Sequence, residues 1–169
     1  MPDRHDITVL SARAEAEAAA RFAAALLKKQ PDYISHGEVQ GGRSPDGARW
    51  ADDLEARLAA EFAAAIDDPD TDVLLARDAN GALAGFALLA LRDEGAGPFG
   101  VIEDIAVAPE ARGSGLGRSL VAEAEARARR RGARWMWLES GLRNAAAHRF
   151  FENLDYRPAS KVFGKPLAD

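Results

Sequence analysis

Three glycines at alternate positions, in the run RGSGLG at residues 112–117, constrain this chain more than any other feature. The run follows the apolar, strand-like stretch IEDIAVA and precedes a strongly helix-forming stretch. Amides at the start of a helix have no partner within the helix and carry partial positive charge, so they bind phosphate groups well. Glycines would let a diphosphate approach that backbone, whereas in a plain turn they would only relieve strain. Arg112 and Arg118 bracket the turn and could add charge-assisted contacts.

Two other phosphate motifs fit less well. A P-loop requires GxxxxGK[ST], but Arg112 stands at the first glycine and Arg118 at the lysine. A dinucleotide fingerprint requires GxGxxG with an acidic residue about 20 positions further on, and Glu139 lies near that distance. However, the third glycine comes one place early and the turn lies deep in the chain. An NAD-dependent oxidoreductase is therefore a weaker alternative.

The hydrophobic periodicity predicts one α/β domain over residues 1–169, in the order β-α-α-β-β-β-α-β-α-β. The expected strands are at 7–12, 71–78, 82–92, 99–108, 133–140 and 156–164, and the expected helices at 14–29, 50–66, 116–131 and 145–154. Asn80-Gly81 predicts a two-residue hairpin turn, and Gly132 a left-handed helix cap. The stretch 31–49 is rich in turn formers, which predicts a long loop that is either a functional lid or locally disordered.

Composition narrows the class of partner. The net charge of −5 argues against nucleic acid or an anionic membrane as the main partner. The RARRR run at 127–131 is interpreted as a solvated helix face, and the three histidines share no metal-ligand spacing, so no metal site is expected. There is no cysteine, no apolar run reaches the ~20 residues of a membrane span, and the charged start MPDRHD does not resemble a signal peptide. These features predict a cytoplasmic protein.

Two motifs resemble those of the GCN5-related N-acetyltransferases, the GNAT family. RGSGLG matches the segment R/Q-x-x-G-x-G/A, and NAAAHRFFENLDYRP matches N-x-x-A-x-x-F-Y-E-x-x-G-F/Y. The resemblance runs from Val101 to about Leu167, and within the family it is greatest to acetyltransferases of aminoalkylphosphonates and aminoglycosides. It implies a GNAT-like fold with a mixed, mostly antiparallel sheet flanked by helices. It also implies transfer of acetyl from acetyl-CoA to a primary amine of a small molecule, a protein N-terminus or a lysine.

The resemblance further implies which residues hold acetyl-CoA. The backbone of Ile105, Ala106 and Val107 would pair with the pantetheine arm as an added strand would. The pyrophosphate would bind the amides of the glycine turn, namely Arg112, Gly113, Ser114, Gly115, Leu116, Gly117, Arg118 and Ser119. Asn144 would hydrogen-bond the cofactor from the second motif, a role compatible with capping a helix. Phe151 would lie against the cofactor in the same motif.

A base is needed because an alkylammonium, with a pKa near ~10, must lose a proton before it attacks a thioester. Strict alternation would place Glu103 on one face of its strand with Ile105 and Val107, and Asp104 on the other. Glu103 is the first candidate for the base, in line with the family, and its alternative role is a salt bridge to an arginine. Glu139 is the second candidate and Asp104 the third.

Phe151 departs from the family, which usually carries a tyrosine there as the acid for the departing thiolate. A thiol with a pKa near ~8.5 leaves tolerably well as an anion, so an enzyme remains the leading hypothesis. A non-catalytic acyl-CoA-binding regulatory module is the alternative, and a homodimer is left open. Asp155 replaces the usual glycine before Tyr156, and aspartate tolerates the left-handed conformation moderately well.

Overall fold

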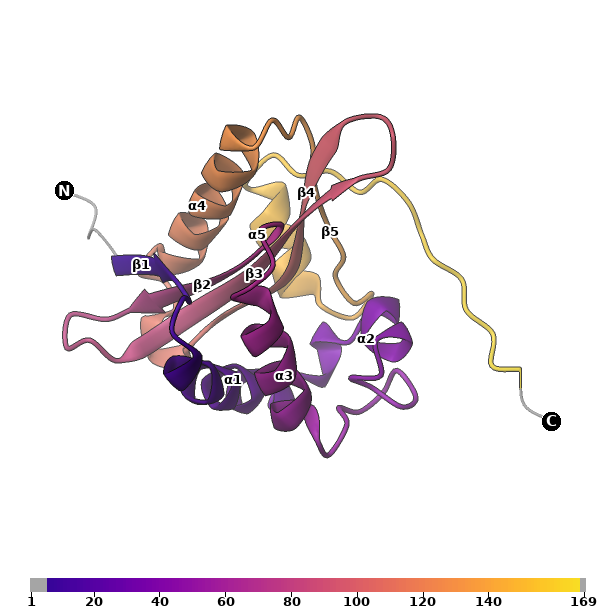
Figure 1. Ribbon diagram of the computed structural model, residues 1–169. Coiled ribbons are helices and arrows are strands. Elements are labelled where there is room, and N and C mark those ends of the chain that lie inside the picture. The colour runs from indigo at the N-terminus through magenta and orange to yellow at the C-terminus, as the bar shows by residue number, and fades with distance from the viewer. Residues whose placement is uncertain (1–5, 168–169) are drawn as a thin grey trace. The chain divides into compact units, whose positions relative to one another are not determined.

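The computed structural model describes residues 6–167, and Figure 1 shows their arrangement into helices and strands. The strands are β1 (Asp6–Val9), β2 (Thr71–Arg77), β3 (Leu83–Asp93), β4 (Pro98–Val107) and β5 (Met136–Leu138). The helices are α1 (Arg13–Lys28), α2 (His36–Gln40), α3 (Leu54–Ala65), α4 (Leu116–Arg130) and α5 (Ala145–Glu152), with 3₁₀ turns at Pro31–Tyr33 and Pro109–Ala111. No helix within the described residues is long and apolar enough to span a bilayer.

The chain divides into two compact units. The first consists of Met1–Lys29 and Asp53–Glu139 and therefore holds the whole sheet with α1, α3 and α4. The second consists of Gln30–Asp52 and Ser140–Asp169 and holds α2 and α5. The prediction of a single domain over the whole chain stays a prediction.

The sheet of the first unit has the strand order β1-β2-β3-β4-β5. Neighbouring strands are antiparallel except for β4 and β5, which are parallel. A parallel pair needs a crossover connection, and α4 supplies it here. The expected mixed, mostly antiparallel sheet flanked by helices is confirmed.

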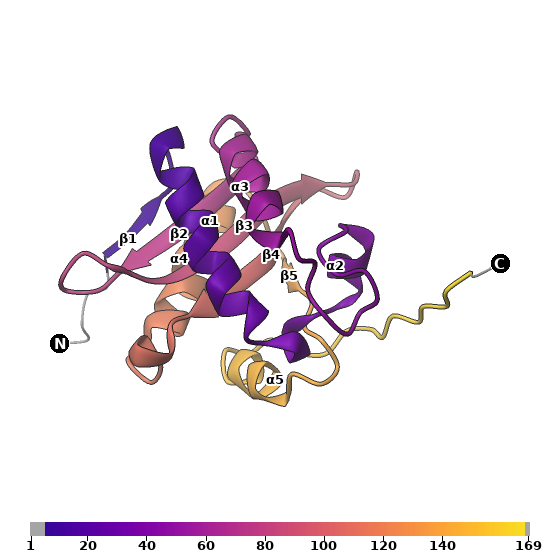
Figure 2. The same ribbon diagram turned by 90° about the horizontal axis from the view of Figure 1, so that it is seen from below.

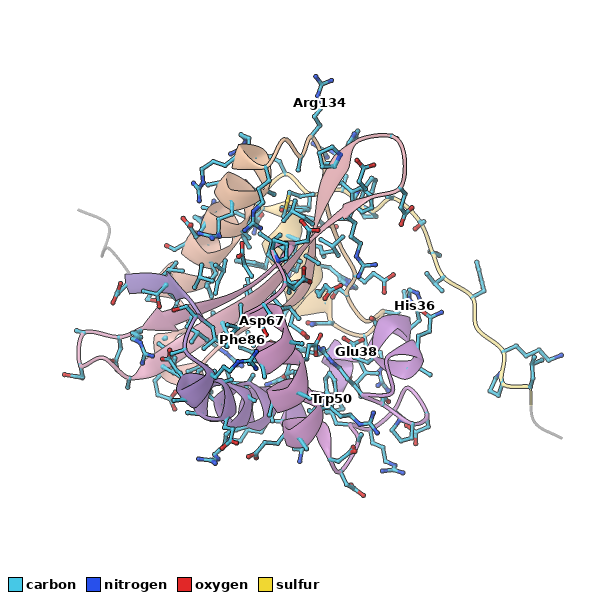
Figure 3. All side chains as sticks on the ribbon, viewed as in Figure 1. His36, Glu38, Trp50, Asp67, Phe86 and Arg134 are labelled. Carbon is cyan, nitrogen blue, oxygen red and sulfur yellow. The ribbon has the colours of Figure 1, made fainter. Side chains whose placement is uncertain are left out.

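Helices cover both faces of this sheet, with α4 on one face and α1 with α3 on the other (Figures 1 and 2). Two neighbouring residues of β3, Gly85 and Phe86, show how the strand packs against helices on each face. A Cβ atom on Gly85 would lie 3.2–3.3 Å from Leu116 and Leu120 of α4, so glycine lets that helix sit close to the strand. Phe86 points to the opposite face, fully buried, with its ring centroid 6.0 Å from that of Phe62 on α3 (Figure 3). Alternation along β3 thus supplies both layers of the core.

A buried carboxylate ties α4 to β2. Asp72 is 5% exposed and accepts hydrogen bonds from Arg127 (Nε, 2.7 Å) and Arg131 (Nη2, 3.1 Å). Burial by itself would raise the pKa of Asp72, but the hydrogen bonds and charges of the two arginines outweigh burial and hold that pKa below its ordinary value. The RARRR run is therefore partly an internal anchor, which corrects the interpretation of it as a solvated face.

The stretch 31–49 has more local structure than the sequence predicted. Ser35 caps α2 in a capping box, in which the Ser35 backbone N–H donates to the Glu38 carboxylate at 2.8 Å. The Ser44 hydroxyl, also buried, donates to the carbonyl of Arg49 at 2.6 Å. Figure 3 labels Glu38 on α2, and Trp50 directly after this segment. The expectation of a plain loop missed these side-chain-to-backbone bonds, which period counting does not detect.

Other boundaries also differ from expectation. The helix predicted to start at Trp50 starts at Leu54, because the N–H of Ala51 donates to the carbonyl of Arg43 instead of entering a helix. The predicted two-residue hairpin is a longer loop over 78–82, in which the Asp78 carboxylate accepts from the N–H groups of Asn80 and Ala82. Asp78 thus competes with the tight turn that Asn-Gly favours.

The C-terminal part departs most from prediction. Residues 156–167 form no regular structure, whereas a final strand was predicted at 156–164. Val162 and Phe163 are 52% and 92% exposed. Pro158 and Pro166 lack the N–H that a strand ladder requires, which disfavours a strand here. Likewise β5 covers only Met136–Leu138 of the predicted 133–140, since the N–H of Ala133 still donates to the carbonyl of Ala128 at the end of α4. Gly132 between them has φ 84°, which is the left-handed cap that the sequence predicts.

Candidate functional site

The glycine turn joins β4 to α4 in the conformation that its glycines require. Gly113 has φ 79° and Gly115 has φ 85°, a region that residues with side chains rarely adopt. Gly115 is the N-cap of α4 and has no side chain to cap it, while the N–H of Leu116 donates to the Ser114 hydroxyl at 3.4 Å. Leu116 and Leu120, both buried, fix the first turns of α4 against the sheet. The start of α4 is therefore held in place by packing.

This turn leaves room for a ligand. A Cβ atom on Gly113 or Gly115 would have no neighbouring atom within 4 Å, so the space in front of both is open. Arg112 and Arg118 are exposed, and neither forms an ion pair or side-chain hydrogen bond with another residue of the described range 6–167. Open backbone, a helix start and two unengaged guanidinium groups together suit a diphosphate.

The edge of β4 nearest β5 offers a second surface. On its other side β4 pairs with β3 over nearly its whole length. On the β5 side the pairing covers only Gly100, Val101 and Ile102. Among the strands described, none covers that edge at 105–107, where the sequence predicts backbone pairing with the pantetheine arm. The backbone there is free to take an added extended partner.

Glu103 is the extra residue of a β-bulge in β4. Leu88 of β3 stands opposite Asp104, and the next residue, Leu89, stands opposite Ile102, so Glu103 has no partner on β3. Bulges turn a side chain out of the regular alternation and occur often beside active sites. The bulge therefore gives Glu103 an orientation that differs from the one that strict alternation predicts.

An ion pair with Arg92 shows which face Glu103 occupies. Arg92 stands opposite Phe99 on β4, so these two side chains share a face of the sheet. Ile105 stands opposite Ala87. Ala87 and Arg92 are five residues apart on β3, an odd number, so their side chains point to opposite faces of the sheet. Glu103 thus lies on the face opposite Ile105, which corrects the prediction that the two share one. The salt bridge considered as the alternative role of Glu103 is present.

The other two carboxylates occupy different surroundings. Asp104 is 7% exposed, so it sits in the core of the first unit. Glu139 is exposed and directly follows β5. Glu103, whose side chain is 26% exposed, is buried enough to be oriented by its partner yet open enough to meet a ligand. Of the three candidate bases, its surroundings suit the role best.

The second unit holds the second motif. Asn144 caps α5, because its side-chain oxygen accepts from the N–H of Ala147 at 3.1 Å. Phe151 is buried, with ring centroids of Phe150 and Tyr156 at 5.1 and 5.7 Å. Asp155 has φ 66°, which confirms that aspartate adopts the left-handed conformation at the position of the usual glycine. The cofactor contacts of Asn144 and Phe151 stay predictions.

Sequence reasoning missed Arg92 and the bulge. Arg92 ends the apolar run of β3 and gave no signal beyond its charge. The bulge follows from pairing between strands, which a single strand's pattern does not contain. The adjacent acidic pair in an otherwise apolar strand was the one available sign of a break in the alternation there.

Comparison with known proteins decides the family. The model of the acetyltransferase (GNAT) family matches residues 41–156, more than half of the chain. The chain belongs to the acetyltransferase (GNAT) family. This match confirms the resemblance seen in the two motifs and, at the level of the family, the expectation of an N-acetyltransferase. The mixed sheet of this GNAT protein also rules against the doubly wound fold that the NAD-dependent alternative requires.

Two curated relatives are acetyltransferases by name. Streptothricin acetyltransferase of Streptomyces lavendulae is 40% identical over 90 residues, 53% of this chain and 47% of the relative, so the match spans about half of that protein. Aminoalkylphosphonate N-acetyltransferase of Salmonella typhimurium is 33% identical over 108 residues, 63% of this chain and 70% of the relative.

The fold itself also has solved counterparts. The structure of AAC(6')-Iy, in complex with the bisubstrate analog CoA-S-monomethyl-acetylneamine, superposes with a TM-score of 0.69 at 17% identity. The superposition covers 99% of this GNAT chain and all of the other. At that identity the likeness concerns the fold.

Proposed function

We propose that this GNAT protein is an acetyl-CoA-dependent N-acetyltransferase that acetylates the primary amine of a small molecule. The observation that carries the proposal is the glycine turn before α4, open in front of Gly113 and Gly115 and flanked by two unengaged arginines. A structure with this fold holds a CoA-containing analog, which supports CoA as the ligand of that turn. The free edge of β4 at 105–107 fits the extended pantetheine arm.

Glu103 would serve as the general base. Its carboxylate accepts one proton from the substrate ammonium and later releases it to solvent. The neutral amine attacks the thioester carbonyl carbon that acetyl-CoA supplies, so that a C–N bond forms, the C–S bond breaks and the sulfur keeps the electron pair. The second proton of the amine ends on the thiolate. With Phe151 in place of a tyrosine, no hydroxyl at that position takes part in this transfer.

The names of the two relatives support a small amine as acceptor. One acetylates streptothricin and the other aminoalkylphosphonates. Both match this chain over only part of its length, so the acceptor is a proposal and not a consequence of the family. A protein N-terminus or lysine is the other acceptor compatible with the same chemistry.

A matched pair of glycine variants tests the cofactor site. Gly115→Asn places a side chain in the turn, whereas Gly81→Asn does the same in the β2–β3 loop, where φ is 81° and the space is equally open. Asn tolerates the left-handed conformation, so both variants should fold. We expect acetyl-CoA to raise the melting temperature of the parent and of Gly81→Asn but not of Gly115→Asn. Equal shifts in all three proteins would refute the assignment of the turn.

Turnover separates the enzyme from the alternative, a non-catalytic acyl-CoA-binding module. Release of free thiol from acetyl-CoA, measured with a panel of primary amines, is expected with at least one of them. Binding of acetyl-CoA without thiol release from any amine would favour the regulatory module instead.

A further inference from the structure

The Arg92–Glu103 ion pair joins a cation to the proposed base, Glu103, on one face of the sheet. The side chain of Arg92 is 52% exposed and that of Glu103 is 26% exposed. A pair this open to solvent contributes little to folding. Ala90 lies between them on that face of β3, opposite Val101 of β4. The pair therefore stands where an acceptor would meet the base, and stability does not account for it.

Charge balance limits which acceptors this pair admits. A substrate ammonium that binds Glu103 takes the place of the Arg92 guanidinium or crowds it. A purely cationic acceptor would then leave two cations facing one carboxylate. An acceptor that brings its own anion removes this conflict, because the anion gives Arg92 a new partner of the kind arginine binds best.

We propose that Arg92 and Glu103 form a subsite for short zwitterionic amines. The ammonium of the acceptor binds the Glu103 carboxylate, and a carboxylate or phosphonate about two carbons away binds the Arg92 guanidinium. Arg92 is then a residue that determines specificity, and Glu103 remains the base. This inference rests on the proposed acetyltransferase function and names the substrate class for that same site.

The test compares amines of matched length that differ in charge. The zwitterions are β-alanine and 2-aminoethylphosphonate, ethanolamine is the monocation, and ethylenediamine is the dication. Thiol release from saturating acetyl-CoA gives kcat and KM for each amine with the parent, Arg92→Gln and Arg92→Lys. Arg77→Gln is the matched control, since it breaks the ion pair between Arg77 and Glu15 elsewhere in the same unit.

We expect the parent to favour at least one zwitterion over ethylenediamine by at least tenfold in kcat/KM. Because Arg92 also orients Glu103, Arg92→Gln should lower kcat/KM for every amine, but for that zwitterion by at least tenfold more than for ethanolamine, with the additional loss chiefly in KM. Arg92→Lys should recover part of the loss, and Arg77→Gln should leave the preference unchanged. Comparison of the carboxylate with the phosphonate identifies which anion the subsite takes.

Two results would overturn the subsite. If the parent acetylates ethylenediamine as well as the zwitterions, or if Arg92→Gln lowers kcat/KM equally for every amine, Arg92 does not read the anion and only the subsite fails. If no amine of any charge is acetylated while acetyl-CoA still binds, the proposed enzymatic function fails and the subsite with it.

Discussion

The guanidinium of Arg92 contacts the carboxylate of Glu103 from the neighbouring strand, at the point where Glu103 has no partner of its own on that strand. The contact orients the carboxylate toward one face of the sheet and keeps a cation beside it. An oriented carboxylate on that face suits the role of general base that we propose for Glu103. The first prediction follows from this role.

Glu103→Gln should lower kcat near neutral pH by about 10²-fold, because glutamine cannot accept the proton of the ammonium. The affinity for acetyl-CoA should change little. The loss should shrink as the pH approaches the amine's own pKa near ~10, where the amine deprotonates unaided. A pH series of kcat for parent and variant measures this. A constant rate ratio across that series would argue against proton transfer to Glu103 and direct attention to Glu139.

Acetyl-CoA should stabilise the folded protein. At about 100 times the dissociation constant, a ligand that binds only the native state adds about 2.7 kcal/mol, which for a chain of this size raises Tm by about 5–10 °C. Differential scanning fluorimetry at millimolar acetyl-CoA, with NAD as the comparison ligand, measures the shift. A shift with NAD and none with acetyl-CoA would contradict the cofactor assignment.

Asp72→Asn should destabilise the protein by about 1–3 kcal/mol, because it leaves Arg127 and Arg131 without their buried counter-charge. The native pKa of Asp72 lies below its unfolded value. Its stabilising contribution is therefore complete above about pH 4 and is lost as the pH falls through the native pKa. Urea unfolding of parent and variant at pH 7, 5 and 3 should show a gap that is constant at the first two values and smaller at the third.

Glu55→Gln is the control for Asp72→Asn. It removes a carboxylate that pairs with Arg21 at 3.3 Å on the surface, where both side chains are at least half exposed. Its effect should stay within about 0.5 kcal/mol. An equal loss of unfolding free energy in the two variants would mean that the buried Asp72 cluster stabilises the fold no more than a surface ion pair does.

Phe151→Tyr should leave kcat unchanged or raise it, since the new hydroxyl restores a donor for the departing thiolate. The ring is buried against Phe150 and Tyr156, so an unpaired hydroxyl there would cost stability. Measuring kcat together with Tm separates the two effects. A sharp fall in kcat with an unchanged Tm would show that the site is built around the phenyl ring.

Local patterns predicted the parts of the fold that local forces determine. The helix from Leu116 and its end at Gly132 follow from helix propensity and from the left-handed cap, and both agree with the structure. The strand containing Glu103 follows from alternation. The boundaries that failed depend on particular side chains, such as Asp78, whose carboxylate replaces the expected tight turn.

In the candidate site, too, local features could be predicted from the sequence and contacts between strands could not. The glycine turn was predictable because positive φ at Gly113 and Gly115 is a demand that only one residue type meets freely. The partner of Glu103 was not, because Arg92 lies eleven positions earlier and approaches only when two strands pair in one particular register. Pairing of that kind is a property of the sheet and not of either strand.

Because Glu103 is the extra residue of the bulge, the position of its carboxylate depends on the number of residues in β4 as well as on their chemistry. Deleting one residue from the stretch 99–102 would let β4 pair with β3 without interruption while every remaining side chain kept its identity. The residues between the deletion and Asp104, Glu103 among them, would then shift by one partner on β3 and move to the other face of the sheet. The chain would still contain a glutamate in that strand, a glycine turn after it and an arginine on β3, yet the acid and its cation would no longer meet. Among homologues, an insertion or deletion of a single residue here is therefore a more drastic change than most substitutions of Glu103 itself.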